Sequence, residues 1–119
     1  MCIRDSNDAG LLQRTHEAFN SNEIQLSQTL FDEDALVFRD VSASAVSLKY
    51  NNKTVLTVDS GGAPHLGIWS KPGAAFVCIE PWLGTSDFTD SDGVFKNKDD
   101  LQNLSPGQTF RHSVGVSFP

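Results

Sequence analysis

A glutamate, a proline and a tryptophan near the middle of the chain form the segment best suited to chemistry. Glu80 ends the apolar run 76–79, which is typical of a buried strand, and Pro81 holds the backbone extended while ending the ladder of hydrogen bonds. A carboxylate partly withdrawn from water is a good acceptor for the proton of a hydroxyl group placed against it. Trp82 adds a flat apolar face, of the kind that stacks on a sugar ring, and an indole N–H donor. These residues predict a general base beside a site for a hydroxylated ligand.

The same three residues also have a purely structural interpretation. Glu80 would then leave the core at the edge of a sheet, and Trp82 would cover that edge. The residue types alone leave both interpretations open.

The other residue types that carry chemistry form weaker patterns. Cys2 lies in a polar segment and Cys78 in an apolar run, so they form neither a disulfide framework nor a zinc site with CxxC spacing. We expect Cys78 to be a small buried hydrophobic residue whose thiol is unreactive, because burial in apolar surroundings raises a thiol's pKa. The cysteine usage makes the cytoplasm the default location.

The acidic and glycine-rich turns predict no metal or phosphate site. The run 90–93 is similar to part of a calcium-binding EF-hand loop, but Phe88 and Asp99 would occupy its first and twelfth positions, so a solvated acidic turn is the better interpretation. Gly61 and Gly62 lack the GxGxxG spacing, and no GxSxG elbow is present to support a hydrolase.

The three histidines offer no recognisable catalytic partner. His16 lies in a polar stretch, and His65 follows a proline where a strand would begin, as turn residues often do. His112 falls on the apolar register of the last expected strand, which places it at the margin of packing.

Short apolar or alternating stretches between turn residues must position these side chains, and sustained helical periodicity is scarce. The chain therefore predicts an all-β fold, most simply a β-sandwich or part of a larger one. The expected strands are residues 23–27, 35–38, 45–50, 54–59, 66–69, 74–80 and 108–118.

Turn chemistry connects these expected strands. Residues 51–53, 61–64 and 71–73 tolerate positive φ or preset φ through proline, and the first of these turns predicts a hairpin between strands 45–50 and 54–59. The polar stretch 97–104 is expected to be a loop or a single helical turn.

Length and composition set the class of protein. With 119 residues and 13.0 kDa the chain is sized for one domain, and 39% hydrophobic against 20% charged residues favours a folded chain over a disordered one. Nine basic against fifteen acidic residues, without a basic cluster, make nucleic acid and anionic membranes poor partners. No apolar run is long enough to span a membrane.

The first residues stand apart from the rest of the chain. Residues 1–10 are polar, contain no signal-peptide core and extend no later pattern, so they are either foreign to the fold or the sign of a sequence truncated at its left end. The domain organisation expected is this polar start followed by a partial sandwich domain over residues 11–119.

The segment from Leu66 to Gly84, which includes Ile-Glu-Pro-Trp at 79–82, resembles the C-terminal part of the aldose 1-epimerase (galactose mutarotase-like) family. Within that family the LacX-like branch is the most similar. The resemblance continues through Ser86-Asp87, Gly93, 96–98 and 104–110, and extends leftward through 30–38, where an acidic stretch precedes a short strand.

The resemblance implies a fold, a reaction and site residues. The fold would be the C-terminal part of a large β-sandwich, or supersandwich, and the reaction would interconvert the α and β anomers of a free aldohexose without a metal or other cofactor. Glu80 would be the general base. Asp34 would bind a sugar hydroxyl, with Asp32 as its competitor for that role, and Trp82 would contact the sugar.

One part of the family pattern is missing. The catalytic histidine of the family, and an arginine that helps to hold the sugar, belong to upstream segments that do not match this chain. The chain is therefore expected to be a C-terminal fragment, inactive alone because it lacks the general acid, with exposed sheet edges that favour aggregation.

Two other functions fit the same residues. A carbohydrate-binding β-sandwich would hold a sugar through Glu80 and Trp82 without turnover, and a structural piece would bind no ligand. Neither the identity of the sugar nor the oligomeric state follows from the sequence.

Overall fold

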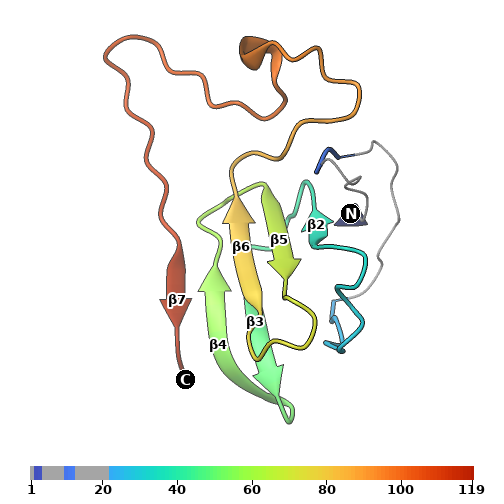
Figure 1. The fold of residues 1–119 in the computed structure, drawn as a ribbon. Helices are drawn as coiled ribbons and strands as arrows, with labels where there is room; N and C mark the ends of the chain where they lie inside the picture. The colour runs from blue at the N-terminus through green and yellow to red at the C-terminus, as the bar shows by residue number, and fades with distance from the viewer. Residues whose placement is uncertain (1, 4–9, 13–21) are drawn as a thin grey trace.

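Two antiparallel β-sheets make up the computed structural model, which describes residues 2–3, 10–12 and 22–119 (Figure 1). One sheet has the strand order β1-β2-β5-β6 and the other the order β3-β4-β7. The all-β prediction is confirmed. The elements are β1 (Cys2–Ile3), β2 (Leu36–Phe38), β3 (Ala45–Tyr50), β4 (Lys53–Asp59), β5 (His65–Trp69), β6 (Cys78–Trp82), the 3-10 helix η1 (Phe95–Asn97) and β7 (Gly115–Ser117).

The β3–β4 hairpin forms where the turn chemistry predicts it. Tyr50 pairs with Lys53, so two asparagines form the whole loop, and their φ angles of 49° and 60° are both in the left-handed region. A type I′ turn requires this conformation, and asparagine tolerates it better than most residues. Strand β4 begins one residue earlier than expected, at Lys53.

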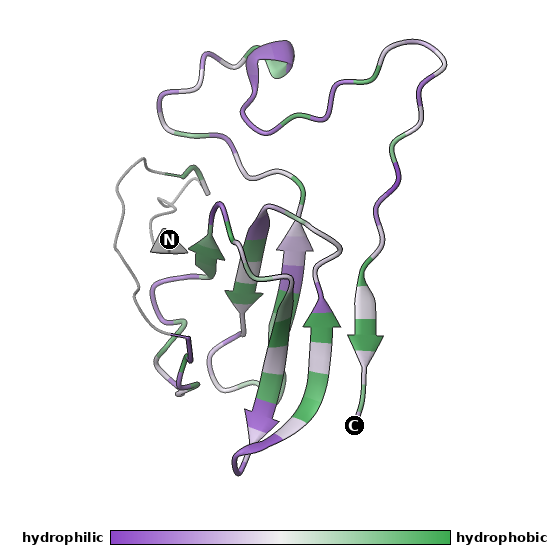
Figure 2. Cartoon of the chain, turned by 180° about the vertical axis from the view of Figure 1, so that it is seen from behind, coloured by the Kyte–Doolittle hydropathy of each residue, from purple (hydrophilic) through white to green (hydrophobic). Residues whose placement is uncertain are grey.

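Alternation along the second sheet separates an apolar face from a polar one. Val58 pairs with Val46 on one side and with Val116 on the other, so these side chains share a face. The neighbouring pair presents hydroxyl groups on the opposite face, where Ser47 Oγ and Thr57 Oγ1 lie 2.8 Å apart. Figure 2 shows the corresponding hydrophobic and hydrophilic bands along these strands.

The core lies between the two sheets. Phe31, Leu36, Leu66 and Ile68 form its buried cluster, and Val46 of the second sheet packs against them. In the first sheet Leu36 pairs with Ile68, which pairs in turn with Ile79, so that one face of β2, β5 and β6 lines the core. This packing of one apolar sheet face against another produces the expected sandwich arrangement.

Strand β6 departs from the prediction at both ends. It begins at Cys78 instead of residue 74, because the Ser70 hydroxyl donates a 2.6 Å hydrogen bond to the Phe76 carbonyl and holds 71–77 in a loop. It continues to Trp82, with Pro81 paired to Leu66. The prediction that Pro81 ends the strand is wrong, because β6 is the last strand of its sheet and proline is tolerated at such an edge.

Two other expected strands are shorter or absent. Residues 23–27 form no strand, and of 108–118 only Gly115–Ser117 pairs, with Thr57–Asp59 of β4. Alternating side chains create a sheet face only where a neighbouring backbone supplies hydrogen bonds. The single helical turn forms at Phe95–Asn97, just ahead of most of the stretch expected to hold it.

The segment just before β7 packs against the turn that follows β4. Gly61 has φ of +60°, and a Cβ atom there would lie 1.8 Å from the Ser113 carbonyl oxygen, so only glycine fits. Next to it, the ring nitrogen Nε2 of His112 lies 3.0 Å from the Ser60 carbonyl oxygen. His112 is half-buried, in agreement with the predicted position at the margin of packing.

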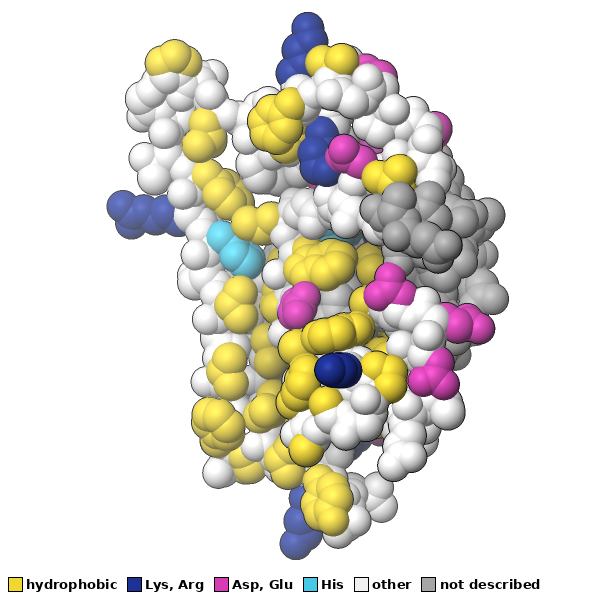
Figure 3. Space-filling model, in the orientation of Figure 1, with side chains coloured by type: hydrophobic (Ala, Val, Ile, Leu, Met, Phe, Trp, Pro, Cys, Tyr) yellow, Lys and Arg dark blue, Asp and Glu magenta, His cyan; other side chains and the backbone are white. Residues whose placement is uncertain are grey.

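The molecule exposes more surface than a compact protein of its size. Its accessible area is 8402 Å², against about 6,300 Å² for a typical folded monomer of this mass. Its radius of gyration is 15.7 Å, against about 13.5 Å for a compact domain of this length. Exposed apolar side chains contribute to the difference, including those of the C-terminal segment seen in Figure 3: Phe110, Val114, Val116 and Phe118. No described helix is both long and apolar enough to cross a membrane.

We predict that this exposed apolar segment makes the chain self-associate. Val116 is 57% exposed on the apolar face of β7, so replacing it with lysine places a charge in the middle of the apolar surface that would associate. Val116→Lys is expected to lower the mass measured by light scattering after size exclusion, toward 13.0 kDa, and to change the free energy of unfolding by less than about 0.5 kcal/mol.

Ser117→Lys is the matched control, because Ser117 is also exposed but lies on the polar face of β7. It is expected to leave the apparent mass unchanged. A wild-type chain that is monomeric at every concentration would contradict the prediction.

Candidate functional site

Glu80 lies in the middle of β6, on the face of the first sheet that is turned away from the core. It pairs with Gly67 of β5, and Gly67 pairs in turn with Val37 of β2. Because side chains alternate along a strand, this face also carries the neighbours of Glu80 at two-residue spacing. We call it the site face; its residues are Val37, His65, Gly67, Trp69, Cys78, Glu80 and Trp82.

The tryptophan of the Glu-Pro-Trp segment is bound directly to the glutamate. The indole Nε1–H of Trp82 donates a hydrogen bond of 3.1 Å to Oε2 of Glu80, in a half-buried position. A bond between a donor and an ionised carboxylate is among the stronger hydrogen bonds in proteins. The sequence-predicted pair is therefore brought together, with the carboxylate and the ring on the same face of β6.

Cys78 flanks Glu80 on the other side. Desolvation raises the pKa of its thiol, and the negative charge of Glu80 and a hydrogen bond from the thiol to that carboxylate raise it further. The expectation of an unreactive thiol agrees with this direction, but the thiol is half-buried on the site face, whereas a fully buried position was predicted. Glu80 thus lies between the indole that donates to it and the thiol whose pKa it helps to raise.

A buried histidine lies directly across from Trp82. His65 is 1% exposed and opens β5, so its prediction as a turn residue is wrong. The backbone N–H of Asp40 donates to its Nδ1 at 3.4 Å, which places the ring proton on Nε2. Nε2 lies 3.1 Å from Oδ2 of Asp100, within ion-pair distance but without the alignment of a good hydrogen bond.

Arg39 completes this charged cluster. Its Nη2 donates a 3.0 Å hydrogen bond to the same oxygen of Asp100, and its guanidinium lies 4.8 Å from the centre of the Phe88 ring. Its Nε is buried, and no described residue accepts a hydrogen bond from it. The cluster fastens the loop after β6 to the ends of β2 and β5, beside Trp82. This cluster was not predicted from the sequence. The only signal for it was His65, which directly precedes the apolar strand 66–69 and continues its alternation of faces.

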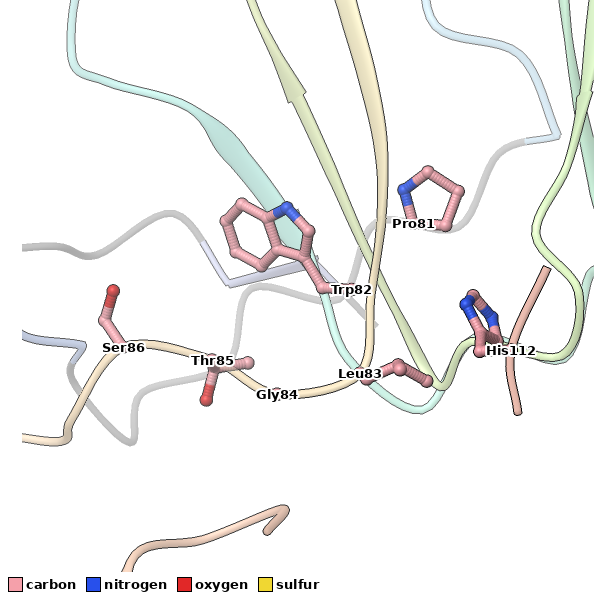
Figure 4. Close-up of a pocket in the computed structure, with 7 residues that line it drawn as sticks. All are labelled: Pro81, Trp82, Leu83, Gly84, Thr85, Ser86 and His112. Carbon is pink, nitrogen blue, oxygen red and sulfur yellow. The ribbon is translucent and has the colours of Figure 1, made fainter. Parts of the chain in front are cut away.

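An open pocket of about 450 Å³ lies at the end of β6 (Figure 4). This volume falls at the lower end of the usual range for small-molecule sites. Trp82 belongs to both the pocket lining and the hydrogen bond to Glu80, so the two features adjoin. The lining residues are Pro81, Trp82, Leu83, Gly84, Thr85, Ser86 and His112.

The predicted sugar-binding carboxylates lie ahead of β2. Asp34 is exposed with φ of 111°, and its Oδ1 accepts a 2.7 Å hydrogen bond from the Ala35 amide. Its competitor Asp32 is also exposed, in the preceding turn. Both aspartates precede β2, and β5 lies between β2 and β6. The axis of β2 is therefore two strand spacings, about 10 Å, from the axis of β6, which carries Glu80. His16 lies outside the described residues.

The acidic turn after β6 satisfies its carboxylates locally. Asp92 accepts hydrogen bonds from the Asn97 amide at 2.7 Å and the Val94 backbone at 2.8 Å, and these bonds lower the pKa of its carboxyl. Asp87 is paired with Lys98. In the described part of the chain, no group of three or more histidine, cysteine or acidic residues is arranged to hold a metal ion.

Comparison with known proteins gives one similar structure. A crystal structure described as the galactose mutarotase related enzyme from Lactobacillus acidophilus matches with a TM-score of 0.72 and 34% sequence identity. The match covers 81% of this chain but 33% of the other, so this chain spans about a third of that protein's length. No protein-family model and no curated protein matches. The two sheets of this chain are thus those of a mutarotase-like β fold.

The charged cluster gives a prediction for stability. Asp100→Asn keeps a residue that tolerates its φ of 63°, but it replaces the charge that Arg39 and His65 face. We expect a loss of about 1–2 kcal/mol in the free energy of unfolding, measured by urea denaturation. Asp32→Asn, at an exposed position, is the control and is expected to change it by less than about 0.5 kcal/mol. Equal effects of the two substitutions would contradict the importance of the cluster.

The raised pKa of Cys78 gives a prediction for reactivity. In a Cys2→Ser background, the thiolate of Cys78 forms only at higher pH than an ordinary thiolate, so alkylation by iodoacetamide near neutral pH is slow. Glu80→Gln removes the neighbouring charge, which lowers the pKa of the thiol and moves the rate profile to lower pH. The profile is measured by mass spectrometry, and an unmoved profile would show that Glu80 does not act on Cys78.

Proposed function

We propose that this chain supplies the general base of a mutarotase-type enzyme, which interconverts the α and β anomers of a free aldohexose. The observation that carries the proposal is Glu80, held in a half-buried position on the site face by the 3.1 Å bond from Trp82 and adjoining a pocket. The 34% identity to a galactose mutarotase related enzyme supports the same class of reaction.

The chemistry needs one base and one acid. Glu80 would take the proton of the anomeric hydroxyl while an acid protonates the ring oxygen, which breaks the bond between that oxygen and the anomeric carbon. The open-chain aldehyde then rotates, and the reverse transfers close the ring on its other face and return both protons. A carboxylate has about four acceptor positions, so Glu80 retains capacity for the sugar after it accepts the bond from Trp82.

The proposed sugar contacts are Trp82 and Asp34. The ring of Trp82 lines the pocket and offers an apolar face to a sugar, while Asp34 is exposed ahead of β2. No metal or other cofactor enters the proposed reaction, and the proposed partner is a small sugar rather than nucleic acid or a membrane.

The proposal extends to the place of this segment in a whole protein. Because the chain spans about a third of the similar structure, we assign the reaction to a longer protein in which this segment is C-terminal and the acid, a histidine, comes from elsewhere. Membership of the LacX-like branch and a cytoplasmic location belong to the same proposal.

Anomer exchange in the 119-residue chain is the first test. Freshly dissolved α-D-glucose or α-D-galactose is followed by polarimetry, and we expect the chain to leave the uncatalysed rate unchanged. Sugar-dependent shifts of the Trp82 indole resonance, measured by NMR, would show that the site still binds. Rate enhancement by the chain alone would contradict the assignment of the acid to another segment.

The role of Glu80 is tested in the longer protein, obtained from the reading frame upstream of the codon for Met1. Glu80→Gln keeps the shape of the side chain but cannot accept the proton, so we expect kcat to fall by about 10²–10⁴-fold. Asp34→Asn is expected to raise KM, and Asp32→Asn serves as its matched control. Full mutarotase activity in Glu80→Gln would overturn the base assignment, and sugar binding without turnover in the wild type would favour a carbohydrate-binding module.

A further inference from the structure

We propose that Trp82 and Gly67 together position Glu80. The indole ring packs against the backbone of Gly67, where no side chain is in the way, and this packing directs the indole N–H to the carboxylate of Glu80. The positioning role rests on the proposed function of Glu80. The hydrogen bond and the packing of the indole on Gly67 are properties of the fold and can be tested without any catalytic activity.

The room for the indole comes from the absence of a side chain at Gly67. A Cβ atom built there would lie 2.6 Å from Cζ2 and 2.8 Å from Cε2 of Trp82, far inside van der Waals contact. Gly67 has none of the positive φ that makes glycine necessary in a turn. The requirement for glycine is therefore one of space on the site face.

The register explains why the indole reaches this space. Trp82 stands opposite His65, and Glu80 stands opposite Gly67. No side chain occupies the position across from Glu80, and the indole leans two residue pairs along the ladder, to the next pair on the same face, to fill it. This direction brings Nε1 to within 3.1 Å of Oε2.

The surroundings of the ring are also fixed. His65 is 1% exposed and is held by the Asp40 amide and Asp100, so it closes the end of the site face beside Trp82. With its N–H committed to Glu80, Trp82 presents its ring to a ligand while its polar atom holds the base. A base held in one orientation loses less freedom when it meets the reacting proton.

The hydrogen bond is tested by NMR of the ¹⁵N-labelled 119-residue chain, which contains two indole N–H groups, those of Trp69 and Trp82. Trp82→Phe identifies the Trp82 resonance. Glu80→Gln is expected to move it upfield and to speed its exchange with water by about tenfold or more, because a charge-assisted bond is lost. The Trp69 resonance should stay in place and report that the chain is folded. An unmoved Trp82 resonance in Glu80→Gln would overturn the bond.

The packing of the indole on Gly67 is tested by comparing alanine substitutions at two glycines. Gly67→Ala is expected to move the Trp82 resonance in the same direction as Glu80→Gln. Gly84→Ala is the matched control, since among the described residues a Cβ at Gly84 would meet only the Asp100 carbonyl oxygen, at 3.8 Å, and it should leave the resonance in place. If Gly67→Ala leaves the Trp82 resonance unmoved in a folded chain, the proposal that Gly67 makes room for the indole is wrong.

A second comparison covers the case in which Gly67→Ala fails to fold. Trp82→Leu removes the three atoms that lie nearest to the added methyl group, so Gly67→Ala should lower the melting temperature much less in that background than in the wild type. An equal loss in both backgrounds would overturn the proposal. Because none of these readouts uses the sugar, their outcome is independent of the test of mutarotase activity.

Discussion

Strand β5 is enclosed on both faces, and the rest of the structure depends on its register. Leu66 and Ile68 point into the core between the sheets, while His65 and Gly67 point to the site face. A slip of one residue would exchange the two sets, placing a histidine in the core and a leucine against Trp82. The apolar core therefore also fixes which residue stands opposite Glu80, and the fold and the candidate site share one constraint.

Local signals made part of the fold predictable. The β3–β4 hairpin followed from two asparagines between apolar strands, because the turn conformation depends on the loop residues themselves. The C-terminal strand was predicted too long. Its alternating side chains indicate two faces, but its paired length depends on where the neighbouring strand β4 ends, at Asp59, opposite Gly115. The end of β6 was misplaced for a related reason: whether proline ends a strand depends on whether another strand lies beyond it, which is a property of the whole sheet.

The candidate site was predictable in its members but not in its partners. Glu80 and Trp82 are two residues apart, so any strand places them on one face, and the residue types indicated the chemistry. Gly67, His65 and Asp100 reach the site through cross-strand pairing and a loop that returns to the sheet, and these contacts join residues far apart in the chain. The sequence carried a weak signal for His65, whose position continues the alternation of β5, but none for Asp100.

The β3–β4 hairpin also bears on the order of folding. Its two strands are joined by two residues, so closing it costs little chain entropy, and isolated hairpins form in about 1–10 μs. The first sheet instead pairs β2 with β5 across the whole hairpin, and Arg39 with Asp100 across 61 residues. The hairpin can be complete during synthesis before β5 and β6 have been made, and its apolar face then offers a surface on which β2, β5 and β6 can pack. The face that carries Glu80 would be assembled last, when the loop bearing Asp100 closes over the ends of the strands.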